Sequence, residues 1–352
     1  MTTPHNVGWD IGGAHLKAAV LNPDGKLLAT YQQPCPLWQG LDQLERAVQT
    51  IMQNLESARH CHAITMTGEL VDLFGCRDDG VRQILDTMKK LLPNTELTAF
   101  AGTAGLLSIG QITAQHYPAI ASANWLASAQ VAAQQCRNGL LVDIGSTTAD
   151  ILLLKDGQVL AEAYSDYGRL ISRELVYTGI IRTPVMAIAQ SVTDNGQDVP
   201  LMAEYFATTA DVYRLTGELD EAHDQTAPAD KGEKTLLASA RRLARMLGSD
   251  FDPTDLPRWQ AVAQHLRLQQ LQTLEQACEL QLSRLPLPNR SPLIGAGVGR
   301  FLVKELARHL RYPYRDFADL LPAPLTNTAL NAADCAPAVA VAYLAHERLA
   351  DY

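Results

Sequence analysis

The sequence predicts an α/β protein of two related domains, each with a mixed sheet flanked by helices. The chain has 352 residues, which is more than one ordinary hydrophobic core accommodates. Strand-like runs alternate with helix-like segments along it, an alternation typical of α/β folds. One pattern of apolar runs and glycines from the N-terminus also returns near residue 140. A repeat of this kind supports two domains of similar architecture.

The composition is that of a soluble globular protein, with 47% hydrophobic and 19% charged residues. The net charge of −9 and the lack of a basic block argue against nucleic acid as a partner. No apolar run reaches the roughly 18 residues of a membrane span, and the first residues lack the pattern of a secretory signal. We therefore expect a cytoplasmic protein with no nucleic-acid or membrane partner.

The six cysteines are scattered, without a CxxC pair or a spacing typical of a metal site. This pattern predicts buried thiols in a reducing compartment rather than a disulfide framework.

The first element is the segment 7–29, VGWDIGGAHLKAAVLNPDGKLLA. An apolar run contains Asp10, and Gly12 and Gly13 follow it directly. A second apolar run carries Lys17, and an Asp-Gly pair separates it from a third. Asp-Gly between strand-like runs is a strong hairpin signal. We therefore expect strand, glycine turn, strand, Asp-Gly turn and strand.

The segment 139–161, GLLVDIGSTTADILLLKDGQVLA, repeats this order. Its counterparts of the first aspartate and glycine loop are Asp143, Gly145, Ser146, Thr147 and Thr148. The repeat predicts an N-terminal domain over 1–137 and a C-terminal domain over 138–352. The second domain is expected to carry a helical and loop insertion over about 195–290.

The remaining elements alternate as an α/β fold requires. Helices are predicted over 41–57, 78–92, 120–135, 235–248, 258–285 and the C-terminal APAVAVAYLAHERL. Strands are predicted within 62–74, over 95–102 and at the start of 291–306, where a glycine loop and a helix follow. The helix over 258–285 could pack in its own domain or pair with a second subunit, so a homodimer is possible.

The stretch 208–234 is polar and rich in turn-forming residues, so it is interpreted as a long loop or insertion. Its acids and His223 are expected on a solvated face, and a lid over the substrate is the alternative. Arg241, Arg242 and Arg245 on the following helix are expected at the surface rather than around a substrate.

The paired loops suggest a phosphate site. Glycines let a phosphate approach backbone N–H groups that a Cβ would obstruct. Asp10 and Asp143 could merely cap their own turns, or they could serve Mg²⁺, which takes oxygen ligands. The repeat favours the second interpretation, and Lys17 is expected to contact phosphate.

Other polar residues could complete such a site. Glu69 in TMTGEL either caps a turn or acts in the site. Arg169, Arg173 and Arg182 surround the stretch YTGIIRTP. An anionic substrate needs countercharge in an acidic protein, and Arg binds phosphate with two parallel hydrogen bonds. Of the three arginines, Arg182 is the first candidate.

Two DIG hairpins and a late strand–GAG–helix unit resemble the acetate and sugar kinase/Hsp70/actin superfamily. The resemblance implies two ribonuclease-H-like domains with an active site in the cleft between them. It implies phosphate contacts from the residues of both loops, and an adenosine-type loop at Gly295, Ala296, Gly297 and Gly299. Ala14 and His15 stand where kinases usually offer a threonine, which argues against ordinary phosphotransfer.

A narrower set of motifs is similar to the hydantoinase/oxoprolinase-like proteins of tetrahydromethanopterin-linked one-carbon metabolism. These motifs are GWDIGGAHLKAA, TMTGELVDLF, LVDIGSTTADI, ELVYTGIIRTPV, TADVYRLTGEL and LIGAGVGRFL. Archaeal relatives include a furan-methanamine synthase of methanofuran biosynthesis. It joins an aminomethyl-furanmethyl diphosphate to the phenol of γ-glutamyltyramine and releases pyrophosphate.

This resemblance implies a Mg²⁺-dependent transferase acting on a furan diphosphate and a tyramine-type phenol. Asp10 and Asp143 would hold the metal, and Asp143 or Glu69 would take the proton of the phenol. The exact acceptor and the binding of a nucleotide stay open. An ATP-dependent small-molecule kinase and a non-catalytic nucleotide-binding protein are the alternatives.

Overall fold

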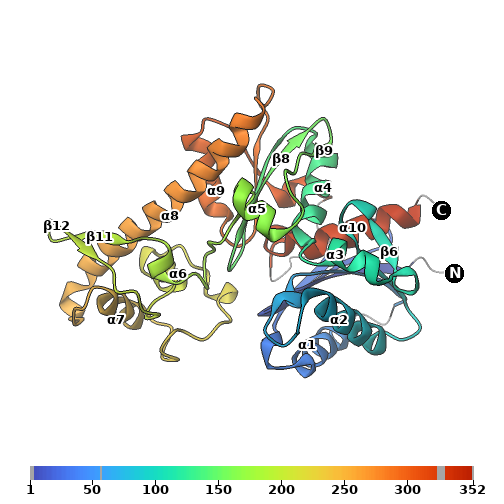
Figure 1. The fold of residues 1–352 in the computed structure, drawn as a ribbon, viewed down its shortest axis with the longest axis horizontal. Coiled ribbons are helices and arrows are strands. Elements are labelled where there is room, and N and C mark those ends of the chain that lie inside the picture. The colour runs from blue at the N-terminus through green and yellow to red at the C-terminus, as the bar shows by residue number, and fades with distance from the viewer. Residues whose placement is uncertain (1–3, 56–57, 323–329, 351–352) are drawn as a thin grey trace. The chain divides into compact units, whose positions relative to one another are not determined.

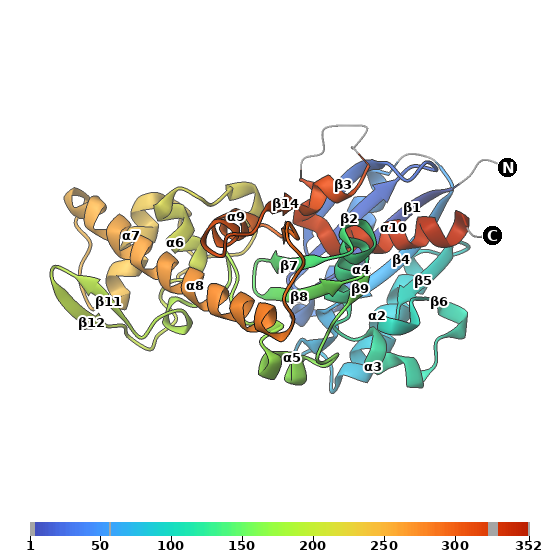
Figure 2. The same cartoon turned by 90° about the horizontal axis from the view of Figure 1, so that it is seen from above.

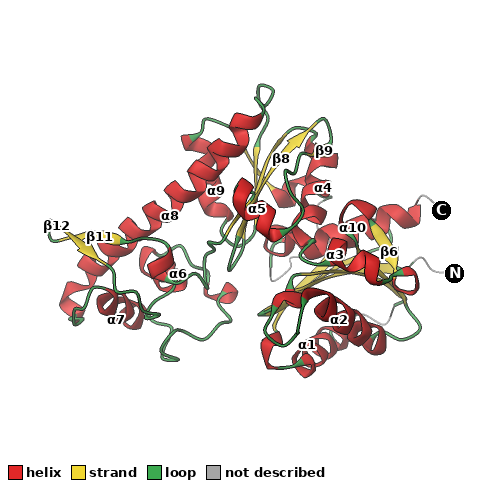
Figure 3. Ribbon diagram, viewed as in Figure 1, coloured by secondary structure: helices red, strands yellow, loops and turns green. Residues whose placement is uncertain are grey.

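The computed structural model describes residues 4–55, 58–322 and 330–350 and has an α/β architecture (Figure 3). The chain divides into two compact units. Unit 1 comprises Met1–Leu141, Leu152–Arg169 and Arg315–Tyr352, and unit 2 comprises Val142–Ile151 and Leu170–Tyr314. These units differ from the predicted domains because the C-terminal segment belongs to unit 1. The domain ranges and the cleft between the domains stay predictions.

Unit 1 contains a mixed six-stranded sheet with the order β3-β2-β1-β4-β5-β6 (Figure 2). Its strands are β1 His5–Ile11, β2 His15–Leu21, β3 Leu27–Pro34, β4 His60–Met66, β5 Glu96–Phe100 and β6 Leu106–Ser108. The first three strands form the predicted antiparallel hairpins. β4 runs parallel to β1, so its carboxyl end lies beside the loop that follows β1.

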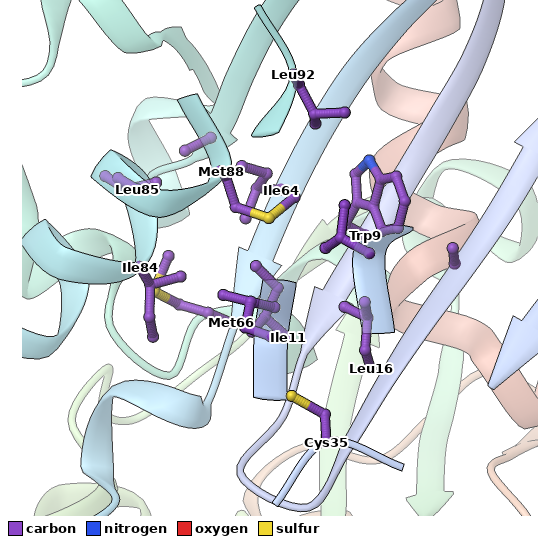
Figure 4. Close-up of a cluster of buried hydrophobic side chains, with 14 of the residues drawn as sticks. Trp9, Ile11, Leu16, Cys35, Ile64, Met66, Ile84, Leu85, Met88 and Leu92 are labelled. Carbon is purple, nitrogen blue, oxygen red and sulfur yellow. The ribbon is translucent and has the colours of Figure 1, made fainter. Parts of the chain in front are cut away.

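Helices α1 Leu41–Gln53 and α2 Arg77–Leu91 cover one face of this sheet. Figure 4 shows part of the buried cluster that joins them to the strands, including Trp9, Ile64 and Met88. Helix α10 Ala336–Ala350 contacts β1, β2 and β4 on the other face (Figure 1). A sheet covered on both faces is typical of α/β proteins.

The predicted helix over 120–135 is wrong at its start. A short helix, α3 Tyr117–Ile120, ends first, and α4 Asn124–Cys136 begins four residues later. Between them Ser122 adopts a left-handed backbone conformation with φ +51°. A left-handed residue interrupts a right-handed helix, and alanine-rich propensity gives no sign of it.

The second hairpin consists of β7 Gly139–Ile144, β8 Ala149–Lys155 and β9 Gln158–Val159, as the repeat predicts. It belongs to a sheet ordered β10-β8-β7-β13-β14, with β9 paired to β8. The other strands are β10 Leu175–Val176, β13 Leu293–Ala296 and β14 Tyr314–Asp316. The division between the two units passes through β7 and β8.

The helices of the second half are α5 Asp166–Ser172, α6 Thr209–Thr216, α7 Leu236–Met246, α8 Leu256–Arg284 and α9 Arg300–His309. A hairpin of β11 Ser191–Asp194 and β12 Gln197–Pro200 packs on α8. Helices α6, α7 and α8 bury a hydrophobic cluster of their own, which includes Trp259 and Leu266. Helix α8 therefore packs inside unit 2, and the homodimer stays a prediction.

The interpretation of 208–234 as one long loop is wrong, because it contains α6. Thr208 and Asp211 form a reciprocal capping box at the start of this helix. Such a box satisfies two backbone N–H groups that helix formation leaves without partners. All residues of α6 except the last are buried. The polar composition of the stretch therefore gave no indication that it contains a packed helix.

The surface location expected for Arg242 is also wrong. Its side chain is fully buried and donates hydrogen bonds to Asp211 and Asp230 at 2.9 Å each. Arg214 donates to Asp224 at 2.7 Å, so two of the acids expected on a solvated face are buried as well. An arginine and an aspartate that are buried together compensate each other's charge. Composition alone cannot predict such pairs, because the partners are distant in the sequence.

The predicted burial of the thiols is correct for four of the six cysteines. Cys76 is exposed and Cys136 is partly exposed, and all six thiols are free. Burial raises the pKa of the Cys35 thiol to about 12, so it stays protonated. Among the described residues, no helix is both long and apolar enough to cross a membrane.

Candidate functional site

The first glycine loop joins β1 to β2 at the edge where β4 also ends. The Gly12 N–H closes the turn by donating to the His15 carbonyl at 3.0 Å. The Gly13 carbonyl accepts from the Leu37 N–H at 3.0 Å, so neighbouring backbone fixes the loop. Asp10, on β1 just before the loop, is 9% exposed and accepts from the Asn124 side-chain amide at 3.3 Å.

Lys17 lies on β2 and is partly buried. Its Nζ donates to the backbone carbonyl of Asp334 at 2.5 Å. The amine therefore connects the hairpin to the segment just before α10. The predicted contact with phosphate stays a prediction.

Glu69 lies in a short turn directly after β4, and only 1% of it is exposed. The Thr67 N–H donates to the Ile11 carbonyl at 3.0 Å, which joins this turn to the first glycine loop. Burial raises the pKa of the Glu69 carboxyl, and the hydrogen bond from Ser122 partly opposes that rise. A raised pKa brings a carboxylate closer to the proton affinity that a general base needs near neutral pH.

The start of α4 supplies three contacts that sequence reasoning missed. Ser122 Oγ donates to Glu69 Oε1 at 2.7 Å, and Asn124 contacts Asp10 as described. The guanidinium of Arg169 stacks over Trp125 at 3.9 Å from the ring centroid, and Arg169 is 1% exposed. The only sign of these contacts in the sequence is a Ser, an Asn and a Trp close together in an alanine-rich run.

The second glycine loop lies in unit 2 and repeats the geometry of the first. The Gly145 N–H donates to the Thr148 carbonyl at 2.9 Å. The backbone N–H groups of Ile180 and Ile181 donate to the Gly145 and Ser146 carbonyls at 3.1 and 3.0 Å. A segment about 35 residues further along the chain thus holds this loop from one side.

Arg182 reaches the second loop with its side chain. Its Nη1 donates to Thr147 Oγ1 at 3.3 Å, and Ser146 Oγ lies 3.4 Å from the same hydroxyl. The structure therefore brings together a guanidinium and two hydroxyls from the predicted site. Arg173, by contrast, makes no contact with this loop among the described residues, and it adopts φ +56° directly after α5.

The late glycine loop approaches Asp143, which is 8% exposed. Gly297 has φ +76°, and a Cβ there would lie 2.4 Å from Asp143 Oδ1. Only glycine combines this conformation with so close an approach. The Gly299 N–H donates to the Ile144 carbonyl at 2.8 Å, while Gly295 lies against the ring of Tyr314.

The donor set is compatible with Mg²⁺ held jointly with a substrate. The described residues contain no group of three or more His, Cys, Asp or Glu side chains arranged to hold a metal. Asp10 and Asp143 instead each offer one carboxylate beside a glycine loop. Mg²⁺ typically takes one or two carboxylates, substrate phosphate oxygens and waters. The residues therefore fit Mg²⁺ bound with a diphosphate, rather than a site made by protein ligands alone.

The family model described as hydantoinase/oxoprolinase matches residues 60–341 of the chain. A protein of Methanocaldococcus jannaschii is 32% identical over 246 residues, which are 69% of this chain and 72% of that protein. It is named (4-{4-[2-(gamma-L-glutamylamino)ethyl]phenoxymethyl}furan-2-yl)methanamine synthase. A protein of the same name from Methanococcus vannielii is 33% identical over 116 residues, covering 33% of this chain and 52% of that protein.

The structure is also similar to the nucleotide-free structure of acetone carboxylase, with a TM-score of 0.57. The match covers 97% of this chain and 70% of that chain at 11% sequence identity. At this identity the likeness concerns the fold alone. It confirms the predicted fold class of mixed sheets flanked by helices.

Proposed function

The chain belongs to the hydantoinase/oxoprolinase family, and we propose on that premise that it is a transferase of methanofuran-type (methylofuran) cofactor biosynthesis, which supports one-carbon metabolism. It forms an ether between the phenol oxygen of tyramine or γ-glutamyltyramine and the furylmethyl carbon of an aminomethyl-furanmethyl diphosphate. The carbon–oxygen bond to the diphosphate breaks, and pyrophosphate leaves with the bonding electrons. The phenol proton passes to a base on the enzyme.

The observation that carries this function is the 32% identity to the Methanocaldococcus jannaschii synthase over 69% of the chain. The name of that relative describes a phenoxymethyl furan, which is the ether that such a substitution produces. A furan ring delocalises positive charge at the adjacent carbon, so stabilising the leaving group is the main catalytic task.

The second glycine loop is proposed to hold the diphosphate. Its hydroxyls, Ser146 and Thr147, lie beside the Arg182 guanidinium, and this combination suits phosphate oxygens. Mg²⁺, when bound by Asp10 and Asp143, would neutralise the negative charge that develops on the departing diphosphate.

The remaining loop residues are assigned by the same reasoning. The N–H groups of Gly12 and Gly145 already close their turns, so phosphate contacts fall to N–H groups that follow them in each loop. The proposed set comprises Gly12 and Gly145, which leave room for the diphosphate because they lack side chains, together with Gly13, Thr148, and Gly295, Gly297 and Gly299 of the late loop. Lys17 is its weakest member, because its amine already donates to the Asp334 carbonyl.

Glu69 is proposed as the base rather than Asp143. Phenols have a pKa near 10, so a base with a raised pKa removes their proton more readily. Burial raises the pKa of Glu69 in this way, whereas Asp143 is proposed to serve the metal in its ionised form. Because Glu69 is 1% exposed, the phenol must open the loops around it to reach the carboxyl.

The test is pyrophosphate release by the purified protein from the furan diphosphate and tyramine, with and without ATP. The proposal requires pyrophosphate and the aryl ether, identified by mass, in equal amounts without ATP. Release of ADP in proportion to a phosphorylated acceptor would instead identify a kinase. Binding of ATP without turnover of either substrate would identify a nucleotide-binding protein.

A further inference from the structure

A three-residue segment that runs from Ser122 to Asn124, the first residue of α4, contacts two carboxyls of the proposed site. Ser122 donates to Glu69 at 2.7 Å, and the Asn124 amide contacts Asp10 at 3.3 Å. Both carboxyls belong to unit 1 but lie more than 50 residues before this segment in the chain. The segment is therefore placed to control the orientation of the acidic groups.

Ser122 adopts its position against its own backbone preference. Its φ of +51° lies in the left-handed region, and the residue is 7% exposed. Glycine would occupy this conformation without strain. Serine in this backbone conformation costs conformational free energy, and residues in such conformations are often found at functional sites. What serine adds over glycine at this position is the hydroxyl that contacts Glu69.

The Glu69 carboxyl uses only one of its two oxygens in hydrogen bonding. Oε1 accepts from Ser122, while Oε2 is buried without a hydrogen-bond partner among the described residues. Buried polar atoms nearly always have partners, so an exception calls for an explanation. An oxygen kept clear of donors is ready to receive a proton.

The backbone of Glu69 is fixed as firmly as its side chain. A Cβ on Gly80 of α2 would lie 2.6 Å from the Glu69 carbonyl oxygen, so α2 packs directly on this turn. Charged neighbours balance one another, because Arg77 forms an ion pair with Asp166 at 2.6 Å. Apart from the backbone of Glu69 itself, Ser122 is thus the side chain that sets the direction of the carboxyl.

We propose that Ser122 is a positioning residue that holds Glu69 through Oε1 and leaves Oε2 to accept the proton of the phenol. The inference rests on the proposed function for the reaction that Glu69 serves. In the step, the phenol O–H bond breaks and a proton–Oε2 bond forms. The phenolate oxygen then bonds to the furylmethyl carbon as pyrophosphate leaves. Ser122 keeps its own proton throughout.

The experiment compares Ser122→Gly with Ser128→Ala in the full chain. Glycine suits φ +51° and removes only the hydroxyl, so the variant should fold at least as well as the wild type. Ser128 is a buried serine of α4 whose hydroxyl has no hydrogen-bond partner among the described residues, which makes it the matched control. Thermal unfolding of both variants checks that the fold is intact.

Ser122→Gly should lower kcat by roughly tenfold or more and change KM for the phenol less than about twofold, since misplacing a catalytic group affects the chemical step. Ser128→Ala should retain wild-type kcat. Glu69→Gln combined with Ser122→Gly should be no slower than Glu69→Gln alone, because both changes affect one proton transfer. Wild-type kcat in Ser122→Gly, or additive losses in the double variant, would overturn the inference.

A second readout does not depend on turnover. Carbon-13 NMR of glutamate carboxyls, with Glu69→Gln for assignment, follows the titration of Glu69. Loss of the Ser122 hydrogen bond should raise the pKa of Glu69, because that bond lowers it in the wild type. An unchanged titration would refute the positioning role. A wild type that releases no pyrophosphate would instead refute the proposed function, while the titration still decides the role of Ser122.

Discussion

The two glycine loops share one backbone design and differ in the side chains around them. In each, the glycine N–H after the aspartate donates to a carbonyl three residues on, at 3.0 Å in the first loop and 2.9 Å in the second. Around the first loop lie the carboxyls of Asp10 and Glu69, contacted by Asn124 and Ser122. Around the second lie the hydroxyls of the loop and the Arg182 guanidinium.

We interpret this difference as one backbone scaffold that carries two different sets of side chains. A buried acid suits proton transfer, and a cation with hydroxyls suits an oxyanion. We therefore expect changes at the second loop to affect the leaving group and changes at the first loop to affect the phenol.

Metal removal should have the largest effect, because the proposed metal serves both loops. Excess chelator should abolish pyrophosphate release, and added Mg²⁺ should restore it. The proposed carboxylates and a polyanionic leaving group give the reason. Full activity in excess chelator would exclude a metal from the mechanism and leave Asp10 and Asp143 without their common role.

Asp143→Asn should lower kcat by roughly a hundredfold or more, about 2.7 kcal/mol of transition-state stabilisation. The change keeps the shape of the side chain but removes the charge that would hold the metal, so thermal unfolding should change little. The control is Asp156→Asn at the exposed tip of the same hairpin, where φ is +52° and asparagine is tolerated. Near-normal turnover in a folded Asp143→Asn protein would leave the second loop as architecture alone.

Glu69→Gln should lower kcat by roughly a hundredfold through loss of the base, within the range of general base catalysis. An amide oxygen still accepts the Ser122 hydrogen bond, so the fold should persist. With a tyramine-type acceptor whose phenol is made more acidic by ring fluorination, the loss should shrink, because less help is needed to remove the proton. An equal loss with both acceptors would contradict the assignment of Glu69 as base.

The same substitution should change how stability depends on pH. The pKa of Glu69 in the folded state is raised above its unfolded value. Its contribution to stability is therefore fully present below the unfolded pKa and is lost as pH rises through the folded pKa. Glu69→Gln removes this loss, so its unfolding free energy relative to the wild type should increase with pH above about 4.5. Denaturant titrations at several pH values measure this difference.

Arg182→Lys should raise KM for the furan diphosphate by roughly tenfold with a smaller change in kcat. Lysine keeps the charge but cannot offer the planar pair of donors that matches a phosphate. Arg173→Lys is the control, since no contact of Arg173 with the second loop is seen among the described residues. Equal effects of the two changes would show that Arg182 acts only through charge.

The sequence predicted the parts of the fold that depend on local pattern. Both hairpins, the strand–glycine loop–helix unit at Leu293 and the main helices follow from periodicity and turn residues, which act over a few positions. The helix α6 was missed because its polar residues are buried through partners elsewhere, such as Arg242 for Asp211. A local sequence pattern cannot show that a distant residue compensates the charge of a buried one.

The same limit applies to the site. The loop residues and Arg182 were predicted because a repeat and a family motif mark them. The contacts of Ser122 and Asn124 were not, because they depend on which strand ends meet the start of α4. The roles of all these residues, the loop residues and Arg182 included, stay predictions until they are measured.

Lys17→Met should have the smallest effect on turnover and should instead lower stability. The amine donates to the Asp334 carbonyl at 2.5 Å, between β2 and the segment before α10. Hydrogen bonds that involve a charged group contribute about 1.5–3 kcal/mol, so the loss should appear in urea unfolding. KM for the diphosphate should change less than about threefold, because an amine held by a carbonyl has less to offer a phosphate.

Lys26→Met, an exposed lysine of the same hairpin, should change neither quantity. A larger rise in KM for Lys17→Met than for Arg182→Lys, with stability unchanged, would place the diphosphate at the first loop and reverse the division of roles between the two loops.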